Sequence, residues 1–165
     1  MTIKFFTTGG TIDKIYFDAK SEYQVGSPQV IEVLEQAHVA FLYEVVPILK
    51  KDSLELTDDD RELIRKAVEV DTHERIVITH GTDTMTETAK RLQGIVGKTI
   101  VLTGALEPAI SKYTDATFNI GAAVAAVQCL PNGIYIAMNG RVFPAMQVRK
   151  NRALRRFEEI QSPIE

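Results

Sequence analysis

The sequence predicts an α/β fold in three layers, a Rossmann-like arrangement in which a mostly parallel sheet is flanked by helices. Short runs of β-branched residues alternate along the chain with longer segments of helical periodicity, the order of elements found in parallel α/β sheets. Residues 75–79 are apolar without alternation, which is typical of a strand covered on both faces. A length of 165 residues without a linker or repeat corresponds to about one domain, so we expect a single domain over residues 1–165.

Each element follows from a local pattern. Apolar and β-branched runs predict strands at residues 3–7, 43–49, 75–79, 99–103 and 133–138. Apolar positions at helical spacing predict helices at residues 29–40, 85–94, 116–130 and 149–160. A further helix opens at residues 57–60, where a threonine cap and three acids favour the positive end of the helix dipole. Its buried face is expected to comprise Leu63, Ile64, Ala67 and Val68.

Two segments have special compositions. Residues 12–28 are long for a connection in a compact domain, and such loops are usually functional lids or binding loops. Between Arg141 and Arg156 the chain has six basic residues and no acidic one. We interpret this cluster as the solvated face of the last helix, with docking on a partner subunit or intersubunit ion pairs as the alternative. The basic residues are Arg141, Arg149, Lys150, Arg152, Arg155 and Arg156, and the apolar residues at helical spacing are Ala153, Leu154, Phe157 and Ile160.

Charge and cysteine content argue against several classes of protein. The chain has 19 basic and 22 acidic residues and a formal net charge of -3, whereas nucleic-acid-binding domains are usually basic. No apolar run approaches the roughly 18 residues of a membrane-spanning helix, and the first residues lack the apolar core of a signal peptide. We therefore expect a cytoplasmic protein with no nucleic-acid and no membrane partner. The lone cysteine, Cys129, excludes an intramolecular disulfide and is expected to be buried.

Polar residues follow four of the predicted strands at the point where each strand ends. Because ligands bind beyond the carboxyl ends of the strands in open parallel sheets, these residues predict a pocket for a small polar substrate. They are residues 8–11 after the first strand, Asp52 and Ser53 after the second, Thr82 and Asp83 after the third, and Gly104 and Ala105 after the fourth. Neither a phosphate-binding glycine loop nor zinc-ligand spacing occurs, so we expect no cofactor and no metal.

Thr11 and His80 each have two interpretations. Thr11 follows two glycines, which would present its hydroxyl beside backbone N–H groups as a nucleophile requires. Threonine also commonly hydrogen-bonds such turns, and this tetrapeptide alone favours the second role. His80 is a candidate metal ligand or general base, but no other histidine or cysteine lies near it in the sequence. We therefore interpret His80 as a structural hydrogen-bonding residue.

Two motifs, each after an apolar strand, resemble those of the bacterial-type L-asparaginases: Thr8-Gly9-Gly10-Thr11-Ile12 and, at residues 79–85, Thr-His-Gly-Thr-Asp-Thr-Met. The resemblance covers nearly the whole chain but only the larger, N-terminal domain of the usual family member. It implies that residues 1–165 form one catalytic domain of the N-terminal type. The other matching positions are Tyr23, Asp52-Ser53, residues 104–108, Asp115, Phe118-Asn119 and Lys150.

The resemblance implies an amidohydrolase that splits L-asparagine into L-aspartate and ammonia through a threonine nucleophile and an acyl-enzyme. Thr11 corresponds to the nucleophile, with Tyr23 beside it on a mobile loop, although Thr82 stays open as the residue that attacks first. Thr82, Asp83 and Lys150 correspond to a Thr-Lys-Asp group in which the lysine can relay a proton. The implied substrate-binding positions are Gly10, Asp52, Ser53, Gly81, Thr82, Asp83 and Ala105, with Ser53 on the substrate carboxylate and Asp83 on its ammonium.

Three departures from the family affect what carries over. Leu54 stands where secreted relatives often have a polar residue, and Glu107 stands where many have arginine. The second domain, which in usual members closes a neighbouring subunit's site, has no counterpart, so we expect residues 12–28 or a partner in a homodimer or homotetramer to complete the pocket. Two alternatives remain: a glutaminase or other small-amide amidase, because one methylene changes binding by only about 1–3 kcal/mol, and a non-catalytic domain that senses asparagine or aspartate.

Overall fold

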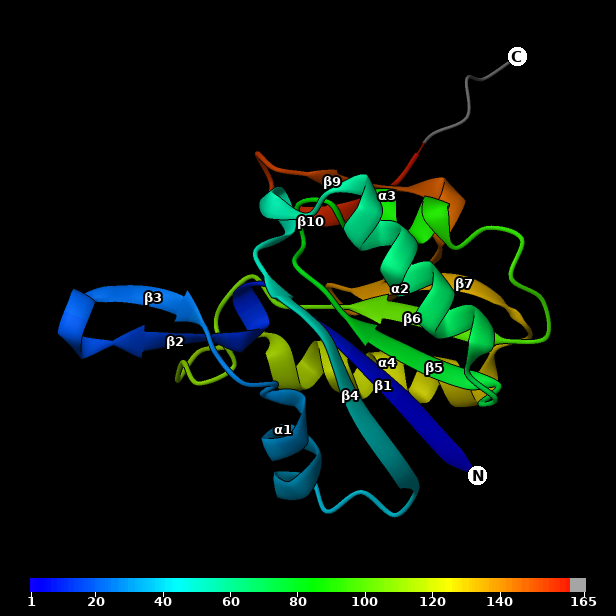
Figure 1. Cartoon of the computed structure of the whole chain (residues 1–165), viewed down its shortest axis with the longest axis horizontal. Helices are drawn as coiled ribbons and strands as arrows, with labels where there is room; N and C mark the ends of the chain where they lie inside the picture. Colours follow the sequence, from blue (N-terminus) through cyan, green and yellow to red (C-terminus); the bar gives the residue numbers. More distant parts are fainter. Residues whose placement is uncertain (161–165) are drawn as a thin grey trace.

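The computed structural model describes residues 1–160 and centres on one six-stranded sheet (Figure 1). The strand order is β4-β1-β5-β6-β7-β8, in which β8 is antiparallel to β7 and the other neighbours are parallel. The predicted α/β fold class with a mostly parallel sheet is therefore confirmed. The strands are β1 (Thr2–Gly9), β4 (Leu42–Lys51), β5 (Arg75–Thr79), β6 (Thr99–Thr103), β7 (Gly133–Met138) and β8 (Arg141–Pro144).

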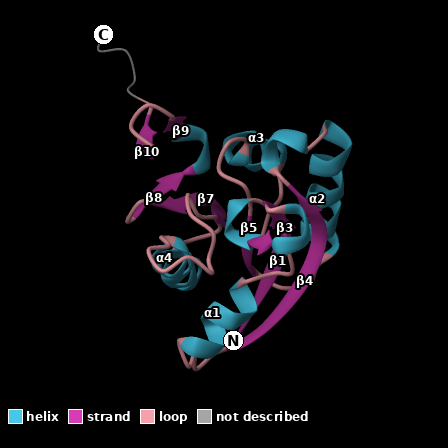
Figure 2. Cartoon of the chain, turned by 90° about the vertical axis from the view of Figure 1, so that its left-hand side faces the viewer, coloured by secondary structure: helices cyan, strands magenta, loops and turns pink. Residues whose placement is uncertain are grey.

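Helices cover both faces of this sheet (Figure 2). The helices α1 and α4 pack on one face, and α2 and α3 pack on the other. Successive residues of β5 accordingly join different cores, since Ile76 and Ile78 pack with Ile64 of α2 whereas Val77 packs with Ala123 of α4. Burial on both faces is why this strand is continuously apolar. The helices are α1 (Val30–Gln36), α2 (Asp58–Val70), α3 (Met85–Arg91) and α4 (Ala116–Cys129).

The start of α2 forms as predicted, through a capping box. The Thr57 hydroxyl accepts the N–H of Asp60 at 3.2 Å, and the Asp60 carboxylate accepts the N–H of Thr57 at 2.9 Å. These two bonds satisfy donors that the first helical turn leaves free. Ile64 and Val68 are buried as expected, but Leu63 is 48% exposed, so its assignment to the buried face was wrong.

Other helix ends also depart from the predictions. The helices α1 and α3 end before the predicted residues 40 and 94. Cys129 closes α4 and is exposed, so the expectation of a buried cysteine was wrong. None of the helices within residues 1–160 is long and apolar enough to cross a membrane.

Residues 12–28, expected to be irregular, contain a short hairpin that projects from the body of the protein (Figure 1). Its antiparallel strands are β2 (Lys14–Phe17) and β3 (Glu22–Val25). Asp13 holds the base: its buried carboxylate accepts the N–H of Gln29 at 2.9 Å, and its carbonyl accepts the N–H of Gly26 at 2.6 Å. The hairpin therefore projects from a base that is bonded to the start of α1.

The helix predicted over residues 149–160 was wrong, because this segment forms two antiparallel strands, β9 (Val148–Asn151) and β10 (Arg156–Glu159). Of the four apolar residues that suggested a helix, Phe157 alone is buried. Glu158 lies opposite Arg149 and accepts two hydrogen bonds from its guanidinium, at 2.8 and 3.1 Å. A cross-strand ion pair and one buried aromatic favour a hairpin here over an isolated helix.

Candidate active site

Three loops that follow neighbouring strands meet with their backbones in direct contact. Gly10 follows β1 and lies against Gly81, which follows β5: a Cβ added to Gly10 would be 2.5 Å from the Cα of Gly81. A Cβ added to Gly81 would be 2.6 Å from the Cβ of Ser53, which follows β4. Gly10 also has a φ of +86°, which other residues rarely adopt. The two glycine motifs and the segment at Ser53 therefore form one close-packed group.

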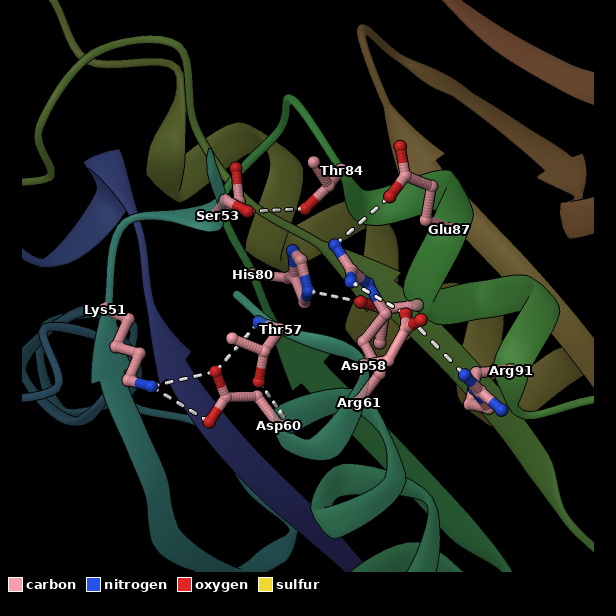
Figure 3. A network of polar contacts seen from close by, with 11 residues as sticks. Lys51, Ser53, Thr57, Asp58, Asp60, Arg61, His80, Thr84, Glu87 and Arg91 are labelled. Carbon is pink, nitrogen blue, oxygen red and sulfur yellow. Dashed lines mark hydrogen bonds and ion pairs between the residues drawn. The ribbon is translucent and has the colours of Figure 1, made fainter. Parts of the chain in front are cut away.

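Buried hydroxyl groups join these loops by hydrogen bonds. The Thr84 hydroxyl donates to the Ser53 carbonyl at 2.8 Å (Figure 3), which ties the loop after β4 to the loop after β5. The Thr8 hydroxyl donates to the Thr79 carbonyl at 3.0 Å, which ties β1 to β5. Both bonds lie in the interior, where an unpaired hydroxyl would be costly, so the positions of the loops are well defined.

His80 is buried behind this group. Its Nδ1 lies 2.7 Å from the Gly81 carbonyl, and its Nε2 lies 2.7 Å from the Thr88 hydroxyl. Burial lowers the pKa of His80 to about 4, so the ring is neutral at pH 7. Because the carbonyl can only accept, Nδ1 carries the proton and Nε2 accepts from Thr88. His80 therefore orients the Gly81 peptide. Within residues 1–160, no group of three or more acidic, histidine or cysteine side chains is placed to hold a metal ion.

Lys150 reaches this edge of the sheet from the β9–β10 hairpin. Its ammonium donates to the Thr82 hydroxyl and to the Asp83 carboxylate, each at 2.8 Å. Lys150 lies opposite Phe157 in the strand register, and Phe157 is buried in the core beside the sheet. The buried aromatic thus anchors the strand that carries the lysine. Three residues from two distant parts of the sequence form one hydrogen-bonded group of hydroxyl, ammonium and carboxylate.

A pocket of about 290 Å³ opens beside this group. Thr11, half-buried at the start of a 3-10 turn after β1, contributes a second hydroxyl to its lining. A space of this size accommodates a small polar molecule. It is lined by Thr11, Thr82, Asp83, Leu106, Lys150, Arg152 and Arg155.

Comparison with known proteins gives the family. The family model described as "Asparaginase, N-terminal" matches residues 2–164. The chain belongs to the asparaginase family. This confirms the resemblance that the two glycine motifs indicate.

Individual asparaginases are similar over most of this chain. The chain is 33% identical over 159 residues to "L-asparaginase 2" of Escherichia coli. It is 32% identical over 159 residues to "Probable L-asparaginase periplasmic" of Haemophilus influenzae. Each alignment covers 90% of this chain and 46% of the relative. The structure of the thermostable L-asparaginase from Thermococcus kodakarensis superposes with a TM-score of 0.84 at 28% identity, covering 99% of this chain and 52% of that one. The chain therefore spans about half the length of these relatives.

Tyr23, which the resemblance places beside Thr11, is not in the lining of this pocket. It lies on β3 of the projecting hairpin and is 56% exposed. Its ring packs edge-on against Tyr16 of β2, with 5.5 Å between ring centroids. In this conformation Tyr23 is separate from the group formed by Thr82, Asp83 and Lys150.

The other expected substrate-binding residues are not in the lining of the pocket: Gly10, Asp52, Ser53, Gly81 and Ala105. Ser53 and Ala105 are each 1% exposed, and Gly81 is packed against Ser53. Asp52 is paired with Lys14 at 3.0 Å and accepts the N–H of Leu54 at 3.1 Å. Burial opposes ionisation, but these two partners hold the pKa of Asp52 below its usual value. These residues support the shape of the site.

Two arginines in the lining were missed as site residues. Arg152 Nε lies 3.5 Å from the Asp83 carboxylate, and an Arg155 Nη lies 2.9 Å from the Glu107 carboxylate. Both had been assigned to the basic face of a helix. Asn151 was the residue in the sequence that could have indicated a turn here, because asparagine favours turns. Its side chain accepts the N–H of Leu154 at 3.1 Å and starts the turn between β9 and β10.

Proposed function

We propose that the chain is an amidohydrolase that converts L-asparagine to L-aspartate and ammonia. The observation that carries this proposal is the contact of Lys150 with Thr82 and Asp83 in the wall of a pocket that also contains Thr11. Two hydroxyls, a lysine and a carboxylate suit acyl transfer with a covalent intermediate. The names of the relatives support asparagine as the substrate.

In the proposed reaction the Thr11 oxygen attacks the side-chain amide carbon of the substrate. The C–N bond breaks, ammonia leaves with the proton taken from the hydroxyl, and an ester to Thr11 remains. Water then hydrolyses the ester and releases aspartate. Lys150 and Thr82 are suited to move the proton, and backbone N–H groups near Gly10 and Thr82 are suited to stabilise the oxyanion.

Two variants test the proposed function. We expect Thr11→Ala to lower the rate of ammonia release by about 10³-fold or more and Lys150→Ala by about 10²–10⁴-fold, with the fold intact. Thr117→Ala is a matched control, because Thr117 is exposed on α4. Wild-type turnover in Thr11→Ala would overturn the assignment, and an acyl adduct on Thr82 by mass spectrometry would identify Thr82 as the nucleophile instead.

A second substrate is favoured by one of the relatives. The "Glutaminase-asparaginase" of Acinetobacter glutaminasificans is 35% identical over 108 residues, covering 62% of this chain and 31% of that protein. Ammonia release should therefore be measured on L-asparagine, L-glutamine and both D-forms. Asparagine binding by calorimetry without ammonia release from any of them would instead support a sensing domain.

We also propose that a second copy of the chain completes the site, in a homodimer or homotetramer in the cytoplasm. The observation that supports this proposal is that the pocket is open to solvent rather than enclosed. Light scattering tests this proposal. A monomer that retains full activity would overturn it.

A further inference from the structure

The peptide between Gly81 and Thr82 is held firmly on its carbonyl side. The Gly81 carbonyl accepts a hydrogen bond from Nδ1 of His80 at 2.7 Å, and the histidine side chain is fully buried. Gly81 itself is packed between Gly10 and Ser53. Contacts on both sides of the glycine and a hydrogen bond to its carbonyl leave this peptide little freedom to rotate.

The N–H of Thr82 belongs to the same peptide and lies on its other side. The peptide is trans, and a trans peptide directs its carbonyl and its N–H in opposite directions. With the carbonyl turned back toward the buried His80, the N–H is directed away from the interior, and Thr82 lines the pocket. Thr82 is 6% exposed, and within residues 1–160 no backbone carbonyl accepts its N–H. Because buried N–H groups are normally paired, this donor is available to a bound substrate.

The ring of His80 is held in turn by Thr88. Thr88 is fully buried in α3, and its hydroxyl donates to Nε2 of the ring at 2.7 Å. Because Nε2 acts as an acceptor, the ring proton stays on Nδ1, where it is shared with the Gly81 carbonyl. Hydroxyl, imidazole and peptide thus form one chain of hydrogen bonds from α3 to the pocket wall. Neither His80 nor Thr88 is in the lining of the pocket, so both can act on a substrate only through this chain.

We propose that His80 and Thr88 are positioning residues that direct the N–H of Thr82 toward the oxyanion of the substrate amide. The inference rests on the proposed amidohydrolase function and deepens it. As the nucleophile attacks, negative charge develops on the amide oxygen, and an N–H fixed in advance stabilises this charge more than it stabilises the neutral amide. Because such a donor acts mainly in the transition state, its misalignment should lower kcat and leave KM nearly unchanged.

Two variants of similar side-chain size separate this role from packing alone. In His80→Asn the amide nitrogen can take the place of Nδ1 and donate to the Gly81 carbonyl, whereas His80→Leu has only methyl groups there. We expect His80→Leu to lower the kcat for ammonia release from L-asparagine about tenfold, because complete loss of one oxyanion donor costs about 10²–10³-fold. His80→Asn should stay within about threefold of the wild type. Equal kcat values for the two variants, or a rise in KM without a fall in kcat, would overturn the proposal.

A second pair of variants repeats the test one step farther from the pocket and decides it if changes at residue 80 prevent folding. Thr88→Ser keeps the hydroxyl and should retain the kcat of the wild type. Thr88→Val has the same shape without the hydroxyl and should lower kcat about threefold, with urea unfolding used to verify that both variants are folded. Equal kcat values in these two variants would overturn the role of Thr88.

The tautomer of His80 provides a test without an activity assay. Nitrogen-15 NMR of the wild-type chain should find the ring proton on Nδ1. A proton on Nε2 would overturn the proposal, because Nδ1 could then not donate to the Gly81 carbonyl. Absence of ammonia release by the wild type from L-asparagine, L-glutamine and both D-forms would instead overturn the proposed function. The NMR result would then decide by itself whether His80 holds the Gly81 peptide.

Discussion

The floor and the rim of the pocket are built in different ways. The floor consists of the loops at Gly10, Ser53 and Gly81, where backbones touch and the buried hydroxyls of Thr8 and Thr84 are paired. The rim consists of the β9–β10 hairpin with the neighbouring Glu107, where exposed side chains are held by ion pairs such as Arg155–Glu107. Close-packed atoms resist displacement, whereas exposed ion pairs contribute about 0–1 kcal/mol and are screened by salt. Substitutions in the floor should therefore change the free energy of unfolding, and those in the rim should mainly change the KM for the substrate.

The largest effect is expected next to the floor, at Asp13, where the β2–β3 hairpin joins the turn after β1. Burial raises the pKa of Asp13 to about 7, although the N–H of Gln29 opposes the shift. Because the folded state holds the proton more tightly than the unfolded state, the stabilisation is complete below about pH 4 and is lost as the pH rises to about 7. Relative to Asp13→Asn, the wild type should lose about 4 kcal/mol over this range.

Urea unfolding of both proteins between pH 4 and 8 measures this difference. His80 titrates with the opposite sign, because its pKa is lowered to about 4 by burial, so its contribution is lost as the pH falls from about 6.5. The contribution of His80 is the same in both proteins, so it cancels from the difference between their stabilities. Parallel stability curves for the wild type and Asp13→Asn would contradict the buried-carboxyl interpretation.

The next effect concerns the floor itself. Gly81→Ala would bring a Cβ within 2.6 Å of Ser53, and we expect the free energy of unfolding to fall by about 1–3 kcal/mol. Gly121→Ala is the control, because nothing lies within 4 Å of a Cβ there and the residue is in α4; it should stabilise by about 0.5–1 kcal/mol. Equal stability of the two variants would show that the loops are not close-packed.

The smallest effect is expected for an ion pair of the rim. Glu107→Gln should change the free energy of unfolding by less than about 1 kcal/mol, while any change in KM should diminish as sodium chloride is added. Glu159→Gln, which removes the partner of Arg141 outside the pocket lining, should leave KM unaltered. A loss of stability above about 2 kcal/mol in Glu107→Gln would mean that the rim is built like the floor.

The same contrast accounts for what sequence analysis could predict. The central strands and the glycine turns carry strong local signals, because a strand covered on both faces is apolar throughout and few residues can replace Gly10 at a positive φ. The loops of the floor therefore followed from the sequence. That they contact one another is a consequence of the parallel strand order, which the alternation of elements also indicates.

The rim could not be predicted in this way, because its structure depends on distant contacts. The N–H of Phe157 is accepted by the Asn139 side chain at 2.8 Å, and Arg141 pairs with Glu159 at 2.7 Å. These partners lie far outside the window in which helical spacing is judged, so the apolar positions at 153–160 indicated a helix that does not form. Cys129 was misplaced for a related reason, since an alanine- and valine-rich helix gives little indication of which side faces solvent.

The position of the β9–β10 hairpin has a consequence for how such a protein acquires new substrates. One continuous segment of the chain, residues 148–159, supplies the lysine of the hydroxyl-ammonium-carboxylate group and both arginines of the pocket wall. It forms a two-stranded sheet of its own, separate from the central sheet. Recombination that exchanges this stretch between relatives would change the lysine and both arginines of the pocket wall together and leave the strands of the central sheet as they are.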